Sequence, residues 1–238
     1  MIDKTVASIS EALEDVADGA TILVGGFGTA GQPTELIEAL LDHGARELTV
    51  VSNNAGSGDE GLALLLAQGR VRKIICSFPR QADSWHFDRL YRAGRIELEL
   101  IPQGNLAERL RAAGAGIGGF FTPTGYGTEL AKGKESRVIG GKGYVLESPL
   151  HGDLALIKAE RSDRWGNLTY RKAARNFGPV MAMAARTTVA SVHELVELGS
   201  LDPESVVTPG IHVNRVVCIP RSQTRPGGFK TTNREDRQ

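Results

Sequence analysis

The sequence VGGFGTAGQP, residues 24–33, connects an apolar strand-type run to a helix-type run that begins at Pro33. Gly26, Gly28 and Gly31 match the G-x-G-x-x-G spacing of dinucleotide-binding loops letter for letter. A tight turn needs one or two glycines for positive φ, and this stretch holds four in seven residues. We therefore expect backbone that approaches a ligand closely, and a plain strand-to-helix turn is the structural alternative.

The dinucleotide interpretation requires an acidic residue at the end of the second strand, about 20 residues further on. The predicted second strand, residues 47–51, is followed by Ser52-Asn53-Asn54, and the next acidic residues are Asp59 and Glu60. No Gly-Lys-Ser/Thr phosphate loop follows either. The pattern therefore favours another anionic group, or a developing oxyanion, at backbone N–H groups before a helix.

Strand-type and helix-type runs alternate through the first half of the chain, which is typical of parallel βαβ units. We expect strands at residues 21–24, 47–51, 71–78 and 96–101, and helices at 5–17, 33–43, 59–68, 83–93 and 105–111. Beyond them we expect a long functional loop at 114–127, β-hairpins at 137–147 and 153–172, a helix at 178–186 and a strand at 187–192. The prediction is a single α/β domain over residues 1–220, with a mostly parallel open sheet flanked by helices and an added β-hairpin region. Residues 221–238 are polar without periodicity, and we expect a disordered tail there.

Charge and cysteine content narrow the class of protein. Basic and acidic residues are equal at 28 each, which argues against nucleic-acid or anionic-membrane partners. The first 20 residues carry five acidic side chains, unlike a secretory signal, and no apolar run reaches bilayer length. Two distant cysteines make neither a disulfide framework nor a zinc pair. We expect a cytoplasmic protein without a bound metal.

Polar side chains follow several of the predicted strands, at the sheet edge where ligands of open α/β sheets bind. The strand ends carry residues 25–28, Asn53-Asn54, Cys76-Ser77 and Gln103. Asn and Gln amides can hold a carbonyl or carboxylate. The alternative is a turn role, because Asn is an ordinary turn former and Gln103 lies between Pro102 and Gly104. Cys76 as a nucleophile is the alternative to a small buried side chain, which we favour. The five histidines show no metal-ligand spacing, and no nucleophile elbow exists, so the chain has candidate binding groups without a catalytic set, and a partner subunit is worth considering.

A longer pattern around the glycine loop resembles the signature of family I CoA-transferases of the small-subunit type. Its residues are Asp18-Gly19-x-x-Ile22-Leu23-Val24-Gly25-Gly26-Phe27-x-x-x-Gly31-x-Pro33. Segments 52–56, 102–109, 122–128 and 175–177 are similar to the same family, and the resemblance runs from about residue 4 to 217. It implies a CoA-transferase fold and a CoA thioester as substrate, with no permanently bound cofactor.

The resemblance also implies that the nucleophile, a glutamate, lies on a B subunit in a heterodimer or A2B2 assembly. That glutamate passes CoA from succinyl-CoA to a 3-oxoacid by a ping-pong scheme, so this chain carries no catalytic residue of its own. The substrate-binding residues it implies are Val24, Gly25, Gly26, Phe27, Gly28, Thr29 and Ala30 in the loop, with Asn53, Asn54 and Gln103 near the reacting carbonyl.

Within the family, residues 76–81 and 163–172 are similar to A subunits that act on 3-oxoadipate. Acetoacetate-type A subunits are the alternative, and a free-standing Rossmann-like nucleotide-binding module is the alternative from another class. Arg80, Lys172 and Arg175 are candidates for the distal carboxylate of the acceptor by charge alone, and a solvated surface role suits each of them better.

Overall fold

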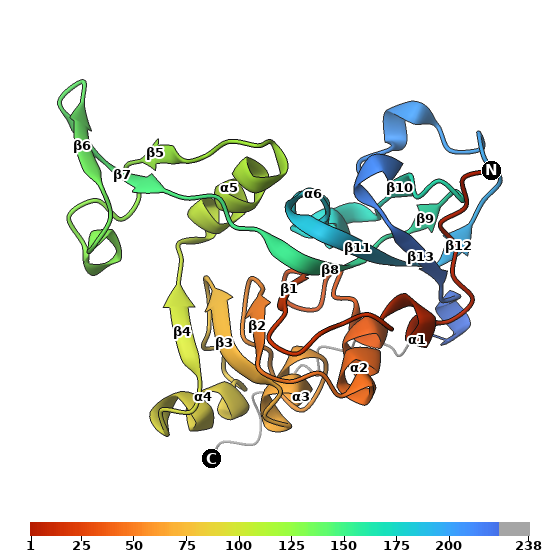
Figure 1. The fold of residues 1–238 in the computed structure, drawn as a ribbon, viewed down its shortest axis with the longest axis horizontal. Helices are drawn as coiled ribbons and strands as arrows, with labels where there is room; N and C mark the ends of the chain where they lie inside the picture. The colour runs from red at the N-terminus through yellow and green to blue at the C-terminus, as the bar shows by residue number, and fades with distance from the viewer. Residues whose placement is uncertain (224–238) are drawn as a thin grey trace, which may run out of the picture.

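Seven parallel strands form the central sheet, in the order β13-β11-β8-β1-β2-β3-β4 (Figure 1). The structure is a computed structural model and describes residues 1–223. The strands are β1 (Thr21–Val24), β2 (Leu48–Val51), β3 (Val71–Cys76), β4 (Glu97–Leu100), β8 (Gly152–Lys158), β11 (Ala185–Val192) and β13 (Arg215–Cys218). The predicted mostly parallel α/β sheet is therefore confirmed, and β1 has the predicted bounds.

Helices cover both faces of this sheet, so most of its strands are apolar on both sides. The helices are α1 (Ile9–Ala12), α2 (Thr34–His43), α3 (Leu62–Ala67), α4 (Trp85–Arg92), α5 (Gln103–Gly114) and α6 (Gly178–Ala184). Helices α2, α3 and α4 pack on one face, and α5 and α6 pack on the other (Figure 1). Along β1, Ile22 and Val24 join the first core and Leu23 joins the second. Helix α2 ends as predicted, with Gly44 in the left-handed conformation.

Two small sheets lie outside the main one. Strands β5 (Phe120–Thr122), β7 (Lys142–Glu147) and β6 (Ser136–Ile139) form an antiparallel sheet that extends away from the domain beyond α5 (Figure 1). Strands β9 (Arg161–Ser162), β10 (Leu168–Thr169) and β12 (Glu194–Leu195) form the other. The predicted hairpin at 137–147 is confirmed by the β6–β7 pair.

Three expectations about local structure need correction. Residues 153–172 do not form one hairpin, because β8 is buried on both faces between β1 and β11, and only the short β9–β10 pair carries residues 163–167 at its tip. The predicted loop at 114–127 contains β5, which pairs with β7. The predicted helix at 5–17 is helical only at 9–12, since the backbone then turns through i→i+3 hydrogen bonds such as Val16 to Leu13. Of the predicted tail, residues 221–223 form a 3-10 turn, and 224–238 lie outside the described residues.

The glycine loop after β1 lies directly against the 3-10 turn η2 (Lys172–Arg175). A Cβ atom on Gly31 would come within 2.2 Å of the Ala174 carbonyl oxygen, and the Gly31 φ is +70°. Backbone cannot move aside as a flexible side-chain end can. Glycine at position 31 therefore permits both the loop conformation and its contact with η2.

We expect Gly31→Ala to lower the melting temperature well beyond the effect of Gly69→Ala, because only Gly31 faces backbone. Gly69 has a similar φ of +64° with open space around it, so its substitution costs only about 1–2 kcal/mol of backbone strain, or roughly 2–8 °C. Thermal unfolding followed by circular dichroism measures both. Equal losses for the two variants would contradict the close contact.

Candidate functional site

The loop after β1 reverses direction within four residues. The Phe27 N–H donates to the Ala30 carbonyl at 3.0 Å, and the Ala30 N–H donates to the Phe27 carbonyl at 3.2 Å. Gly28 and Thr29 are therefore the two central residues of a tight turn. The Gly28 φ is +59°, and Thr29 is outside the positive-φ region. Glycine at the first central position is what a type II′ turn requires. We call residues 27–30 the loop tip.

The side chain of Asn176 joins this loop to η2. Its Oδ1 accepts from the N–H of Gly26 at 3.1 Å and of Phe177 at 2.7 Å. Its Nδ2 donates to the carbonyls of Ala30 and Ala173, both at 2.8 Å. All four hydrogen bonds that an amide side chain can make with its two donors and two lone pairs are used. The loop and η2 are thus held as one unit.

Most backbone donors of the loop are used inside the protein. The Gly25 N–H donates to the Leu156 carbonyl of β8 at 3.0 Å, and the amides of Gly26, Phe27 and Ala30 are occupied as described. Among residues 1–223, no acceptor is present for the amides of Gly28, Thr29 and Gly31. The donors available to a ligand therefore lie at the loop tip and directly after it.

Helix α2 begins only at Thr34, so the glycines do not form its first turn. This differs from a dinucleotide-binding loop, in which the motif itself opens the helix and the helix N-terminus binds the pyrophosphate. The expectation that the loop amides lie at a helix N-terminus is wrong for this reason. The glycines instead make the turn and the contact with η2.

Two of the predicted site residues, which follow different strands, form a hydrogen bond with each other. Gln103, the first residue of α5, donates from Nε2 to Oδ1 of Asn53, which follows β2, at 2.6 Å. Asn53 is buried and Gln103 is exposed. Within the described part of the chain Asn53 Nδ2 has no acceptor and is not fully buried, so its N–H groups are available for a further hydrogen bond.

Asn54 forms a turn, which was the alternative to a role in ligand binding. Its Oδ1 accepts from the Gly56 N–H at 2.9 Å, and its side chain is buried. An Asx turn of this kind shapes the loop after β2. Asn54 thereby shapes the turn that follows Asn53, and its Oδ1 is occupied by the Gly56 amide.

A network of charged side chains fixes α5, whose N-cap residue makes no side-chain capping bond. Buried Glu147 accepts from Asn105 at 3.2 Å and from Lys134 at 2.7 Å. Arg109, one turn beyond Asn105, donates to Glu99 at 3.0 Å. Burial opposes ionisation of Glu99, but its hydrogen bonds from Lys73 and Arg109 outweigh burial and lower its pKa. These contacts hold the start of α5, and hence Gln103, against the sheet.

Cys76 is a core residue and not a nucleophile. Its side chain is fully buried, and burial raises the pKa of the thiol to about 12. Residues 1–223 contain no group of three histidine, cysteine or acidic side chains that could hold a metal ion. None of the helices in that range is long and apolar enough to cross a membrane.

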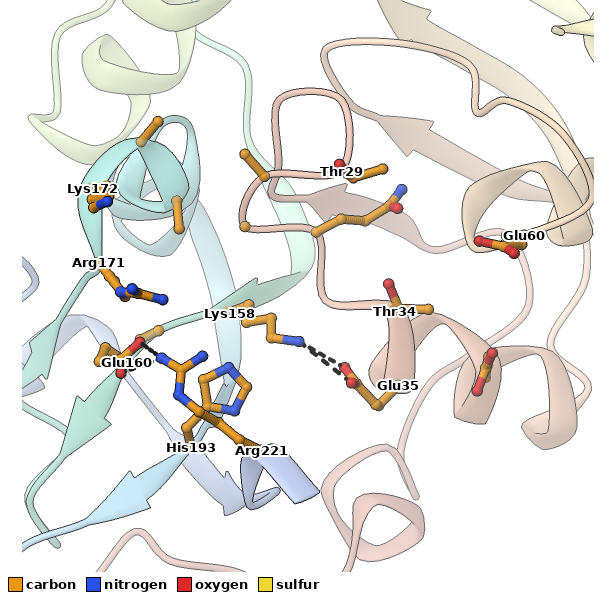
Figure 2. A pocket seen from close by; sticks show the side chains of 17 residues that line it. Thr29, Thr34, Glu35, Glu60, Lys158, Glu160, Arg171, Lys172, His193 and Arg221 are labelled. Atoms are coloured by element: carbon orange, nitrogen blue, oxygen red, sulfur yellow. Dashed lines mark hydrogen bonds and ion pairs between the residues drawn. The ribbon is translucent and has the colours of Figure 1, made fainter. Parts of the chain in front are cut away.

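A cavity of about 780 Å³ opens between the loop and η2 (Figure 2). One side is formed by residues 29–32, the start of α2 and Glu60, and the other by the end of β8 and residues 171–174. Lys158 at the end of β8 pairs with Glu35 of α2 at 3.3 Å, and Arg221 pairs with Glu160.

The three basic residues that were candidates for the distal carboxylate of the acceptor lie in different surroundings in the structure. Lys172 lines the cavity, whereas Arg175 does not, and Arg80 pairs with Asp88 at 2.7 Å on α4. Arg171 also lines the cavity and was not among the sequence candidates. No sequence signal separates Arg171 from the other basic residues of this segment, because a charged residue beside a turn is usually solvated.

Comparison with known proteins identifies the family. The coenzyme A transferase family model matches residues 6–218. The A subunit of the 3-oxoadipate CoA-transferase of Pseudomonas putida is 68% identical over 219 residues, covering 92% of this chain and 95% of the relative. The A subunit of a probable succinyl-CoA:3-ketoacid coenzyme A transferase of Bacillus subtilis is 50% identical over 214 residues, covering 90% and 89%.

A solved structure agrees with these relatives. The acyl-CoA transferase of E. coli O157:H7, in a thioester complex with CoA, matches with a TM-score of 0.80 and 26% identity. The match covers 95% of this chain and 49% of that one, so this chain spans about half the length of that enzyme. Fold and sequence thus lead to one conclusion: the chain belongs to the coenzyme A transferase family.

Proposed function

We propose that this chain is the A subunit of a CoA-transferase that moves CoA from succinyl-CoA to 3-oxoadipate. The observation that carries the proposal is a set of hydrogen-bond donors without a nucleophile: the Gly28 and Thr29 amides and Asn53 Nδ2 have no acceptor within residues 1–223, while Cys76 is buried. The 68% identity to the A subunit of a 3-oxoadipate CoA-transferase supports the choice of substrate, and that relative's name implies a second subunit.

The chemistry begins at a glutamate of the partner subunit. Its carboxylate attacks the thioester carbonyl of succinyl-CoA and expels CoA thiolate, which leaves an acyl-glutamyl anhydride. The thiolate attacks the glutamyl carbonyl and releases succinate, leaving a glutamyl-CoA thioester. The 3-oxoacid carboxylate attacks that thioester and expels CoA thiolate, which leaves a 3-oxoacyl-glutamyl anhydride. The thiolate then attacks the 3-oxoacyl carbonyl of this anhydride, which gives 3-oxoacyl-CoA and releases the glutamate carboxylate.

The donors of this chain act on the oxyanion that forms at each of these attacks. Backbone amides and a fixed amide side chain stabilise such charge because they are oriented before the reaction begins. Asn53 Nδ2, held by Gln103, and the Gly28 and Thr29 amides are the donors that the described residues supply. The chain then contributes positioning and charge stabilisation, and the partner contributes the reacting group.

The same chemistry with acetoacetate, another 3-ketoacid, as acceptor is the second candidate, because the Bacillus subtilis relative that is 50% identical is named for 3-ketoacids in general. The two acceptors differ at the end remote from the reacting carboxylate, where only 3-oxoadipate carries a second carboxylate. The identities favour 3-oxoadipate.

We expect the purified chain to transfer no CoA from succinyl-CoA, and a mixture with its B subunit to be active, because the nucleophile lies on the partner. Formation of 3-oxoacyl-CoA, followed by absorbance or mass spectrometry, measures this. The kcat/KM of the mixture should be higher for 3-oxoadipate than for acetoacetate. Robust turnover by the chain alone would overturn the shared site, and binding of NAD in place of CoA esters would support a nucleotide-binding module.

Gln103→Ala should lower kcat of the assembled enzyme by about 10²-fold, as removal of a donor at an oxyanion site does, since Asn53 is no longer oriented. The melting temperature should change little because Gln103 is exposed. Gln68→Ala, at an exposed glutamine that ends α3, is the matched control and should leave kcat unchanged. If kcat of the Gln103 variant equals that of the control, Gln103 is only the first residue of a helix.

A further inference from the structure

A dicarboxylic acceptor poses a binding problem that acetoacetate does not. The carboxylate remote from the reacting end of 3-oxoadipate loses water on binding, which costs free energy unless cationic donors replace it. Acetoacetate ends in a methyl group at that point. An enzyme that selects the diacid needs unpaired positive charge at a short distance from the reacting group.

The cavity beside the loop tip has Thr29, one of the proposed donors, on one side and a cationic wall of Arg171 and Lys172 on another. Thr29 and Ala30 of the tip line it on one side, and Arg171 and Lys172 line it from the connection between β10 and α6 (Figure 2). In Figure 2 the Arg171 side chain is directed toward the interior, on the side opposite Thr34 and Glu60. A ligand at the loop tip can therefore extend into the cavity toward these two residues.

Arg171 and Lys172 are the cations of this wall that the protein leaves available. Lys158 is paired with Glu35, and Arg221 is paired with Glu160. For the side chains of Arg171 and Lys172, residues 1–223 supply no hydrogen bond or ion pair. The carboxylate of Glu60 faces them across the cavity, so the positive end lies at η2 and the negative end on the far wall.

The backbone at Lys172 is also unusual. Its φ is +51°, and Glu47 is the only other non-glycine residue with positive φ among the described residues. The left-handed conformation costs a side-chain-bearing residue about 1–2 kcal/mol, and such strain persists where the surroundings hold it and gathers at functional sites. Here Asn176, four residues on, ties the Ala173 carbonyl to the loop, which keeps the strained turn in place.

We propose that Arg171 and Lys172 form the subsite for the distal carboxylate of a dicarboxylic 3-oxoacid and thereby select it over acetoacetate. The proposal rests on the transferase function proposed above. A guanidinium and an ammonium together give the carboxylate charge-assisted hydrogen bonds in place of water. Arg175, in the same turn but outside the cavity lining, takes no part.

The test uses the enzyme assembled with its B subunit, with succinyl-CoA as donor. The variants are Arg171→Gln, Lys172→Gln and the double variant, and Arg175→Gln is the matched control. We expect each single substitution to lower kcat/KM for 3-oxoadipate by on the order of tenfold, mainly through KM, and the double by more. The kcat/KM for acetoacetate should stay within about twofold, and Arg171→Lys should recover part of the loss.

The outcomes that would overturn the subsite differ from the outcome that would refute the transferase function. Equal losses for both acceptors, or no loss for 3-oxoadipate, would overturn the subsite while leaving the transferase function standing. A loss for Arg175→Gln as large as for Lys172→Gln would show a general charge effect and overturn the assignment. Wild-type enzyme that transfers CoA to neither acceptor would refute the proposed function itself, and the subsite with it. Melting temperatures of all variants separate these effects from unfolding.

Discussion

One amide side chain holds the functional edge of this protein together. Asn176 accepts from the Gly26 amide and donates to the Ala30 carbonyl, so it closes the loop that follows β1. Its remaining bonds, to Ala173 and Phe177, tie that loop to η2 and to the start of α6. A half-buried amide with all its hydrogen bonds made is costly to displace, because each group would be left without a partner. Asn176 thereby ties the loop tip to η2, which carries Lys172 of the cavity wall.

Along the carboxyl edge of the sheet, some hydrogen-bond donors are used inside the protein and others have no acceptor. Internal hydrogen bonds occupy the amides of Gly25, Gly26, Phe27 and Ala30, and those of Gly28 and Thr29 have no acceptor among the described residues. The Asn53–Gln103 pair places a second donor, supported by the buried contacts of α5 with Glu147. Because these groups are oriented before substrate arrives, they suit stabilisation of developing charge. Amide N–H groups are not nucleophiles, which agrees with the proposal that the reacting group lies on another subunit.

The sequence predicts the fold well where local signals and packing agree. Strand β1 has the predicted bounds, and Gly44 ends α2 as glycine after a helix usually does. Strand β8 is mistaken for part of a hairpin because its partners, β1 and β11, are distant in sequence and its burial on both faces removes the alternation that marks a sheet surface. Short elements such as β12, with two residues, carry too few side chains for a periodic pattern.

The candidate site shows the same limit. Asn53 and Gln103 can be chosen because strand ends gather at one edge, but their contact spans 50 residues of sequence and depends on how α5 docks. The bond from Asn176 to Gly26 spans 150 residues, and no local pattern encodes it. Arg171 cannot be singled out from the sequence because a charged residue beside a turn is usually solvated, and only the cavity distinguishes it from Arg175.

The most direct test of this account is a crystal structure of the chain assembled with its B subunit and holding CoA and 3-oxoadipate. We expect an oxygen of the reacting carboxyl group within about 3 Å of the Thr29 or Gly28 amide nitrogen or of Asn53 Nδ2. The distal carboxylate should lie within hydrogen-bonding distance of Arg171 and Lys172. An acceptor bound away from the loop tip, with the cavity beside η2 filled only by water, would contradict the account.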